Sequence, residues 1–145
     1  MVRKCLLTLD GSSHSLSAAL MGADFAHGQQ AELVVLSVTA PYAYAGVGDA
    51  SASGRQAHAT AQQAPVAAQL ETLRAHCQRL GLPLHEATVE SREPAQAIID
   101  SAQSLDCDLI VMGSRGLGGL GSLVMGSVTQ LVLAQSPVRV MVIRG

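Results

Sequence analysis

Short aliphatic runs alternate along this chain with longer segments whose apolar residues recur at helical spacing, and this alternation constrains the fold most. The runs cover residues 2–9, 32–38, 84–89 and 109–113, with a final run from Val138 to Ile143. Several are apolar at every position, as strands covered by helices on both faces are. The pattern predicts an α/β fold with an open, parallel, five-stranded sheet.

The segments between these runs predict four helices. The first covers residues 13–27, with Ser12 or Ser13 as its N-cap and Gly28 at its end. The second follows Pro65 and ends near Gly81. The third begins at residue 94, and the fourth runs from about residue 126 to 136. Residues 41–64, rich in Ala, Gly, Ser and Gln, are expected to form a mobile loop, although residues 55–63 could instead extend the second helix backwards.

Length, charge and composition exclude several classes of function. A chain of 145 residues that is 48% hydrophobic is expected to form a single domain spanning residues 1–145. A net charge of -2 and 2% aromatic residues disfavour nucleic-acid binding. No apolar stretch approaches the roughly 20 residues of a membrane span. Three well-separated cysteines fit neither a disulfide framework nor a zinc site, so we expect a cytoplasmic protein.

Two junctions carry residues suited to ligand binding, because open parallel sheets bind ligands beyond the carboxyl ends of their strands. One is the turn Asp10-Gly11-Ser12-Ser13-His14, and the other begins at Gly113 and leads to Gly126-Ser127 at a helix start. Gly113 and Gly116 allow close approach of the backbone to a ligand. Amide groups at the helix start favour an anion. The spacing is not that of a P-loop or dinucleotide fingerprint, yet it predicts a phosphate cradle.

The pattern Gly113-x-x-Gly116, nine residues, then Gly126-Ser127 resembles that of the ATP-binding branch of the universal stress protein family. The similarity extends over nearly the whole chain, through Asp10-Gly11-Ser12, Pro94-Ala95 and the final strand. It implies a Rossmann-like sheet of order 3-2-1-4-5. The first and fourth strands would then flank one crevice that holds ATP, either alone or with Mg²⁺. It also implies a homodimer through the strand from Val138 to Ile143. Arg92 departs from the family, in which many members have Gly.

The resemblance also assigns residues to the ligand by position. Asp10 and the backbone of Val38 are expected at the adenine. Met112, Gly113, Gly116, Gly126, Ser127 and Val128 are expected to line the ribose and phosphates. Arg115 is a candidate phosphate clamp, with a solvated side chain as the alternative. The alternative role of Asp10 is to cap the first helix. The alternative for the glycine loop is a turn that binds no ligand.

These residues lead to a main functional hypothesis and two alternatives. The main one is a regulatory stress-response module that binds ATP and hydrolyses it slowly at most, because no general base is evident near the expected γ-phosphate. The first alternative is a nucleotide-independent dimeric scaffold of the same fold. The second is an adenine-nucleotide α-hydrolase, which residues 10–14 disfavour because they lack the pattern Ser-Gly-Gly-x-Asp-Ser.

Overall fold

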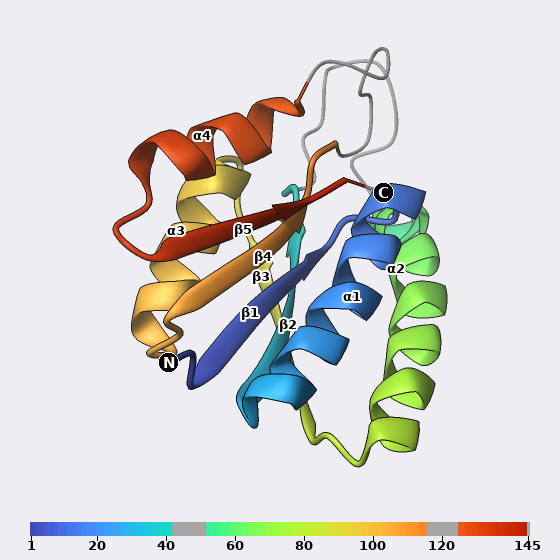
Figure 1. Ribbon diagram of the computed structural model, residues 1–145. Coiled ribbons are helices and arrows are strands. Elements are labelled where there is room, and N and C mark those ends of the chain that lie inside the picture. The colour runs from blue at the N-terminus through green and yellow to red at the C-terminus, as the bar shows by residue number, and fades with distance from the viewer. Residues whose placement is uncertain (42–51, 116–124, 145) are drawn as a thin grey trace.

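The computed structural model describes residues 1–41, 52–115 and 125–144, and the side chains of all of these except residues 52–63. Strands and helices alternate along the described chain (Figure 1). The strands are β1 (Lys4–Leu9), β2 (Glu32–Thr39), β3 (Leu84–Glu90), β4 (Leu109–Gly113) and β5 (Arg139–Ile143). The helices are α1 (Ser13–Gln29), α2 (Ala52–Leu80), α3 (Pro94–Ser104) and α4 (Ser127–Gln135).

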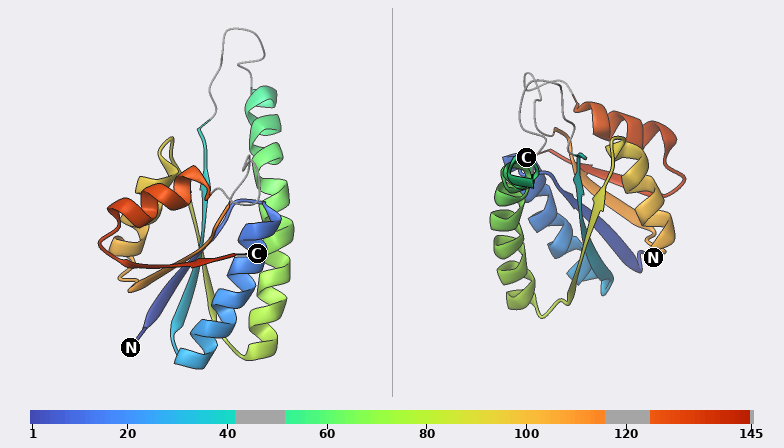
Figure 2. Two further views of the ribbon diagram at one scale, coloured as in Figure 1. Left: turned by 45° about the horizontal axis from the view of Figure 1, so that its top comes forward. Right: turned by 180° about the vertical axis from the view of Figure 1, so that it is seen from behind.

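The five strands form one parallel sheet in the order β3-β2-β1-β4-β5. Helices α1 and α2 cover one face and α3 and α4 the other (Figures 1 and 2). The α/β class, the strand order and the adjacency of the first and fourth strands are therefore confirmed. Strand β1 pairs with β4, with Leu6 opposite Ile110. This pairing joins one half of the sheet, β3-β2-β1, to the other half, β4-β5.

Each face of the sheet has its own hydrophobic core, because successive side chains of a strand point to opposite faces. Leu7 is fully buried in the core beneath α1 and α2, whereas its neighbour Leu6 is fully buried beneath α3 and α4. Leu73 of α2 belongs to the first core and Val132 of α4 to the second. The central strands are covered on both faces, which explains their continuous apolar sequence.

Helix α2 is longer than the sequence analysis expected. The loop predicted over residues 41–64 is wrong from Ala52 onward, where the helix begins, and Pro65 lies inside the helix instead of preceding it. The alternative that residues 55–63 extend this helix backwards is confirmed. Ala and Gln are strong helix formers, and their propensity prevails over the hydrogen bond that a proline removes. Residues 42–51, the remainder of the predicted loop, lie outside the described residues.

Helix α1 also ends later than expected. It continues through Gly28 to Gln29, and Gln30 adopts the left-handed conformation with φ of 55°. The backbone N–H of Gln30 donates to the carbonyls of Ala26 and His27, which closes the helix end. None of the described helices combines the length and apolar character needed to cross a membrane.

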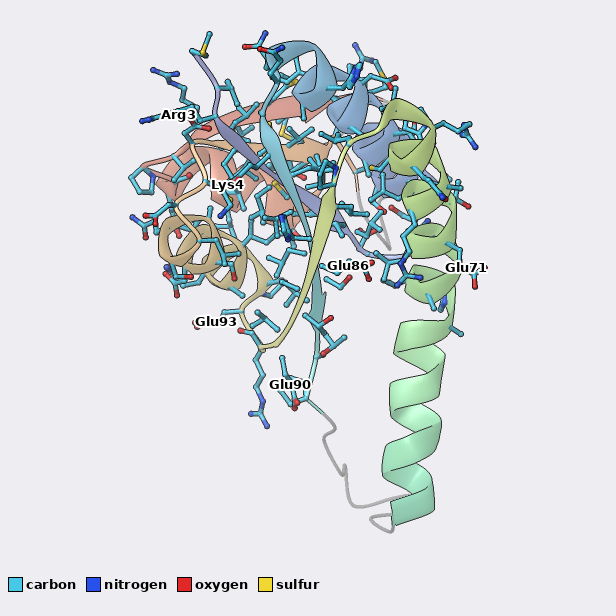
Figure 3. All side chains as sticks on the ribbon, turned by 90° about the horizontal axis from the view of Figure 1, so that it is seen from below. Arg3, Lys4, Glu71, Glu86, Glu90 and Glu93 are labelled. Carbon is cyan, nitrogen blue, oxygen red and sulfur yellow. The ribbon has the colours of Figure 1, made fainter. Side chains whose placement is uncertain are left out.

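An ion pair ties α2 to the edge strand β3. The guanidinium of Arg74 donates two hydrogen bonds of 2.6 Å to the carboxylate of Glu86, and this hydrogen bonding lowers the pKa of Glu86. In Figure 3 the Glu86 side chain lies between β3 and α2, whereas Glu71 points away from the sheet. Both partners are partly exposed, so the pair orients α2 more than it stabilises the fold.

Gly22 permits the close packing of α1 on the sheet. A Cβ added at this residue would lie 2.6 Å from Leu7 Cδ2 and 3.0 Å from Val111 Cγ1. Replacing Gly22 with Val is therefore expected to lower the free energy of unfolding by about 1–3 kcal/mol through overpacking. Urea denaturation measures this change. The control is Gly28→Ala on the same helix, where an added Cβ meets no atom within 4 Å and no loss is expected. Equal losses in both variants would contradict this account of the packing.

Candidate functional site

A cleft of about 500 Å³ lies at the carboxyl ends of the central strands. Its walls are the β1–α1 turn, the ends of β2 and β4, one turn of α2, and the first turns of α3 and α4. The cleft lies where β1 and β4 pair, because the chain leaves these two neighbours toward opposite faces of the sheet. Residues far apart in the sequence therefore meet at this edge.

The β1–α1 turn forms one wall and is held by its own hydrogen bonds. Ser12 is the N-cap of α1, since its side chain accepts a hydrogen bond from the backbone N–H of Ser15. Asp10 Oδ1 accepts hydrogen bonds from the backbone N–H of Ser12 at 2.8 Å and from Ser12 Oγ at 2.6 Å. Gly11 has φ of +90°, a conformation that favours glycine. Asp10 thus braces the capping residue instead of capping the helix directly.

The end of β4 approaches the start of α1 closely. A Cβ added at Gly113 would lie 2.9 Å from the carbonyl oxygen of His14, so a side chain there would push the end of β4 away from the start of α1. The glycine at this position is required by the contact between β4 and α1 itself, whether or not a ligand is present.

The start of α4 is fastened to the end of β4. The backbone N–H of Gly126 donates to the carbonyl of Ser114 at 2.8 Å, and Thr129 Oγ1 donates to the carbonyl of Gly113 at 3.0 Å. Gly126 is the N-cap of α4, and no side-chain hydrogen bond caps this helix. The partial positive charge of the α4 N-terminus therefore lies beside the cleft.

The structure brings eight of the nine predicted site residues to this cleft. They are Asp10 and Val38 at the ends of β1 and β2, Met112, Gly113 and Arg115 at the end of β4, and Gly126, Ser127 and Val128 at the start of α4. The ninth, Gly116, lies outside the described residues. The position of these residues is now known, whereas their roles toward a ligand remain predictions.

Val38 directs backbone groups toward the cleft because of strand geometry. Pairing between β1 and β2 ends at Leu9 opposite Ser37, so β2 continues past the end of β1. The carbonyl of Thr39 accepts a hydrogen bond from the backbone N–H of Ser91 on the β3 side. Successive residues of a strand direct their backbone groups to alternate sides. The backbone N–H and carbonyl of Val38 therefore point toward the β1 side, where the cleft begins.

Helix α2 also contributes to the cleft, which no pattern in the sequence predicted. Pro65 and Val66 line the cleft, and a Cβ added at Gly11 would lie 3.1 Å from Pro65 Cβ. No spacing in the sequence indicates this contact, because it depends on how α2 packs against α1. Thr8 and Leu36 also line the cleft. Their place at the carboxyl ends of predicted strands was a usable signal for both.

The groups with shifted pKa values lie away from this cleft. Burial raises the pKa of Cys5 and of Cys107 to about 11, so both thiols stay protonated and unreactive near neutral pH. At the opposite end of the sheet, burial of Asp108 opposes its ionisation, but hydrogen bonds from the backbone N–H groups of Lys4 and Arg3 outweigh this and lower its pKa. Among the described residues, no three His, Cys, Asp or Glu side chains form a metal-binding group.

Comparison with known proteins gives one consistent family. The model of the universal stress protein family matches residues 1–144. The "Universal stress protein in QAH/OAS sulfhydrylase 3'region" of Thermus aquaticus is 36% identical over 145 residues, which cover 99% of this chain and 100% of that protein. The solved universal stress protein UspA from Lactobacillus plantarum superposes with a TM-score of 0.78 at 25% identity, covering 99% of this chain and 98% of that one. A solved universal stress protein in complex with cAMP has a TM-score of 0.70 at 23% identity, with coverage of 99% and 97%.

The hydrogen bond from Thr129 to Gly113 supplies a test of how α4 is fastened to β4. Thr129 is 4% exposed, so Thr129→Val keeps the shape but removes a buried hydrogen bond. We expect a loss of about 1 kcal/mol in the free energy of unfolding, measured in urea. Thr72→Val is the matched control, because the Thr72 hydroxyl is exposed and bonds only within its own helix. If Thr129→Val lowers the free energy of unfolding no more than Thr72→Val does, this hydrogen bond does not hold α4 to β4.

Proposed function

This chain belongs to the universal stress protein family, and from that premise we propose that it binds an adenine nucleotide, with ATP as the ligand, in the cleft at the carboxyl ends of β1 and β4. The observation that carries the proposal is the convergence of the predicted residues on one cleft of about 500 Å³. That volume is typical of sites for small molecules. The structural neighbour in complex with cAMP supports an adenine nucleotide as the class of ligand.

The β1–β2 side of the cleft suits the base. Leu36, Val38 and Ile98 supply apolar surface, and the backbone of Val38 and the carboxylate of Asp10 supply polar groups beside it. An adenine ring needs this combination, because its faces are apolar and its edge carries both donors and acceptors. In the proposed complex Val38 and Asp10 therefore contact the adenosine part of the nucleotide.

The α4 side of the cleft suits the phosphates. After Gly126, whose own N–H is bonded to Ser114, the residues Ser127 and Val128 present the first backbone N–H groups of a helix that no side chain caps. Arg115 is the only cationic residue among the described lining residues. An ATP molecule carries more negative charge than these groups offset, so we propose that Mg²⁺ accompanies it.

We propose a binding and signalling role with slow hydrolysis at most. Fast phosphoryl transfer requires a positioned nucleophile and strong charge neutralisation at the phosphates. Asp10 is the one carboxylate among the described lining residues, and it is engaged by Ser12 on the adenosine side of the cleft. The three cysteines are free and buried, which supports a reducing, cytoplasmic location.

We also propose that two copies pair through β5. This strand is an edge of the sheet, and its residues Val140, Met141, Val142 and Ile143 are only half-buried. Leu131 and Leu133 of the neighbouring helix α4 are 47% and 43% exposed. An apolar edge strand is an aggregation hazard unless another chain or element covers it, and a second copy would do so.

Calorimetric titration of Mg²⁺-ATP into nucleotide-free protein tests the main proposal. We expect micromolar binding by the wild type and none by Gly126→Val, whose side chain would obstruct the phosphates at the start of α4. Gly28→Ala is the control, because Gly28 lies in α1 away from the cleft. Absence of binding by folded wild-type protein would favour the nucleotide-independent scaffold. Rapid release of AMP and pyrophosphate would favour the α-hydrolase.

A proline in β5 tests the pairing of two copies. Ile143 directs its carbonyl toward Ser114 on the β4 side, so by strand alternation Val140 directs its N–H outward. Val140→Pro removes that outward donor and leaves the hydrogen bonds to β4 in place. We expect sedimentation to give twice the mass of 14.9 kDa for the wild type and for Val140→Ala, and a monomer for Val140→Pro. A monomeric wild type at micromolar concentration would refute the dimer.

A further inference from the structure

Gln69 is a buried amide in an otherwise apolar row of α2. Residues 65, 69, 73 and 77 lie one above another on the helix face that meets α1 and the β1–α1 turn. Leu73 and Cys77 are buried completely or nearly so in the core, as expected for such a row. Gln69 is 9% exposed, and a buried amide is costly unless its polar atoms are hydrogen-bonded. A leucine would fill this position without that cost.

Both ends of the Gln69 amide contact the β1–α1 turn. Its Nε2 donates a hydrogen bond of 2.8 Å to the carbonyl oxygen of Ser12, and its Oε1 lies 3.4 Å from Ser15 Oγ, which donates to it. These contacts join residues 57 and 54 positions apart in the sequence. They are directed at the two residues that form the N-terminal cap of α1.

The same two serines hold Asp10. The backbone N–H and the hydroxyl of Ser12 both donate to Asp10 Oδ1, and the backbone N–H of Asp10 donates to Ser15 Oγ at 3.2 Å. Gln69 is therefore connected to Asp10 by hydrogen bonds through one intervening residue in two ways, through Ser12 and through Ser15. Pro65, one turn earlier on α2, packs against Gly11 in the same turn. Helix α2 thus fixes the turn by a hydrogen-bonded amide and an adjoining ring.

We infer that Gln69 is a positioning residue of the nucleotide site, which holds the Ser12–Ser15 turn so that the Asp10 carboxylate is directed at the adenosine part of the ligand. This role rests on the proposed nucleotide binding. Gln69 itself does not line the cleft, so its effect on the ligand passes through Ser12 and Ser15 to Asp10. It also makes α2 part of the binding site, although this helix supplies none of the predicted ligand contacts.

The test compares the affinity for Mg²⁺-ATP with the thermal unfolding midpoint in a set of variants. Gln69→Leu keeps the packing but removes both hydrogen bonds to the turn, and we expect its Kd to rise about tenfold, within the coupling found inside one hydrogen-bond network. Gln69→Glu is the second variant, since an ionised carboxylate cannot donate to the carbonyl of Ser12. The control is Leu73→Val, which loosens the same helix row one turn away and should lower the midpoint without changing the Kd.

A double-mutant cycle with Asp10→Ala separates positioning from general destabilisation. If Gln69 acts through Asp10, Gln69→Leu changes the Kd less than about twofold once Asp10 is absent. The same tenfold change in the Asp10→Ala background, or a Kd of Gln69→Leu equal to that of the wild type, would overturn the inference. A folded wild type that binds neither Mg²⁺-ATP nor AMP would overturn the proposed function, and the positioning role would fall with it.

Discussion

The pairing of β1 with β4 is the contact on which the rest of this structure depends. It joins the first strand to one formed about a hundred residues later, with Cys5 opposite Leu109 and Leu7 opposite Val111. Because α1 and α4 then pack on opposite faces of the sheet, a cleft lies at the carboxyl ends of β1 and β4. The close approach of Gly113 to the His14 carbonyl fixes how near the end of β4 comes to the start of α1.

Backbone groups, more than charged side chains, define the chemistry of the cleft. Among the described lining residues, Asp10 and Arg115 are the only charged ones. The remaining polarity comes from hydroxyl groups, strand ends and the first turn of α4. Groups of this kind recognise a ligand by shape and hydrogen bonding, as the proposed nucleotide site requires. In the proposed role the site would signal by its occupancy, since binding to the folded state stabilises that state.

Helix α2 has a larger part in the site than its sequence suggests. It is held to β3 by Arg74 and Glu86, and it reaches the β1–α1 turn through the buried Gln69 and the more exposed Pro65. A ligand bound at that turn would therefore also affect the contacts that α2 makes with it. This connection gives the proposed nucleotide a physical route from the cleft to α2, which covers one face of the sheet (Figure 2).

The sequence by itself determined the α/β class and the five strands, because strand runs and helix caps act locally, and the resemblance to the universal stress protein family assigned eight of the residues that line the cleft. Its errors occurred where local signals conflict, as at Pro65, which a continuing helix overrides, and at Gly28, which α1 passes before ending. Only the tertiary structure decided that α2 reaches the β1–α1 turn and that Gln69 is buried against Ser12 and Ser15. Those features arise from contacts between residues distant along the chain, and such contacts leave no periodicity or spacing in the sequence.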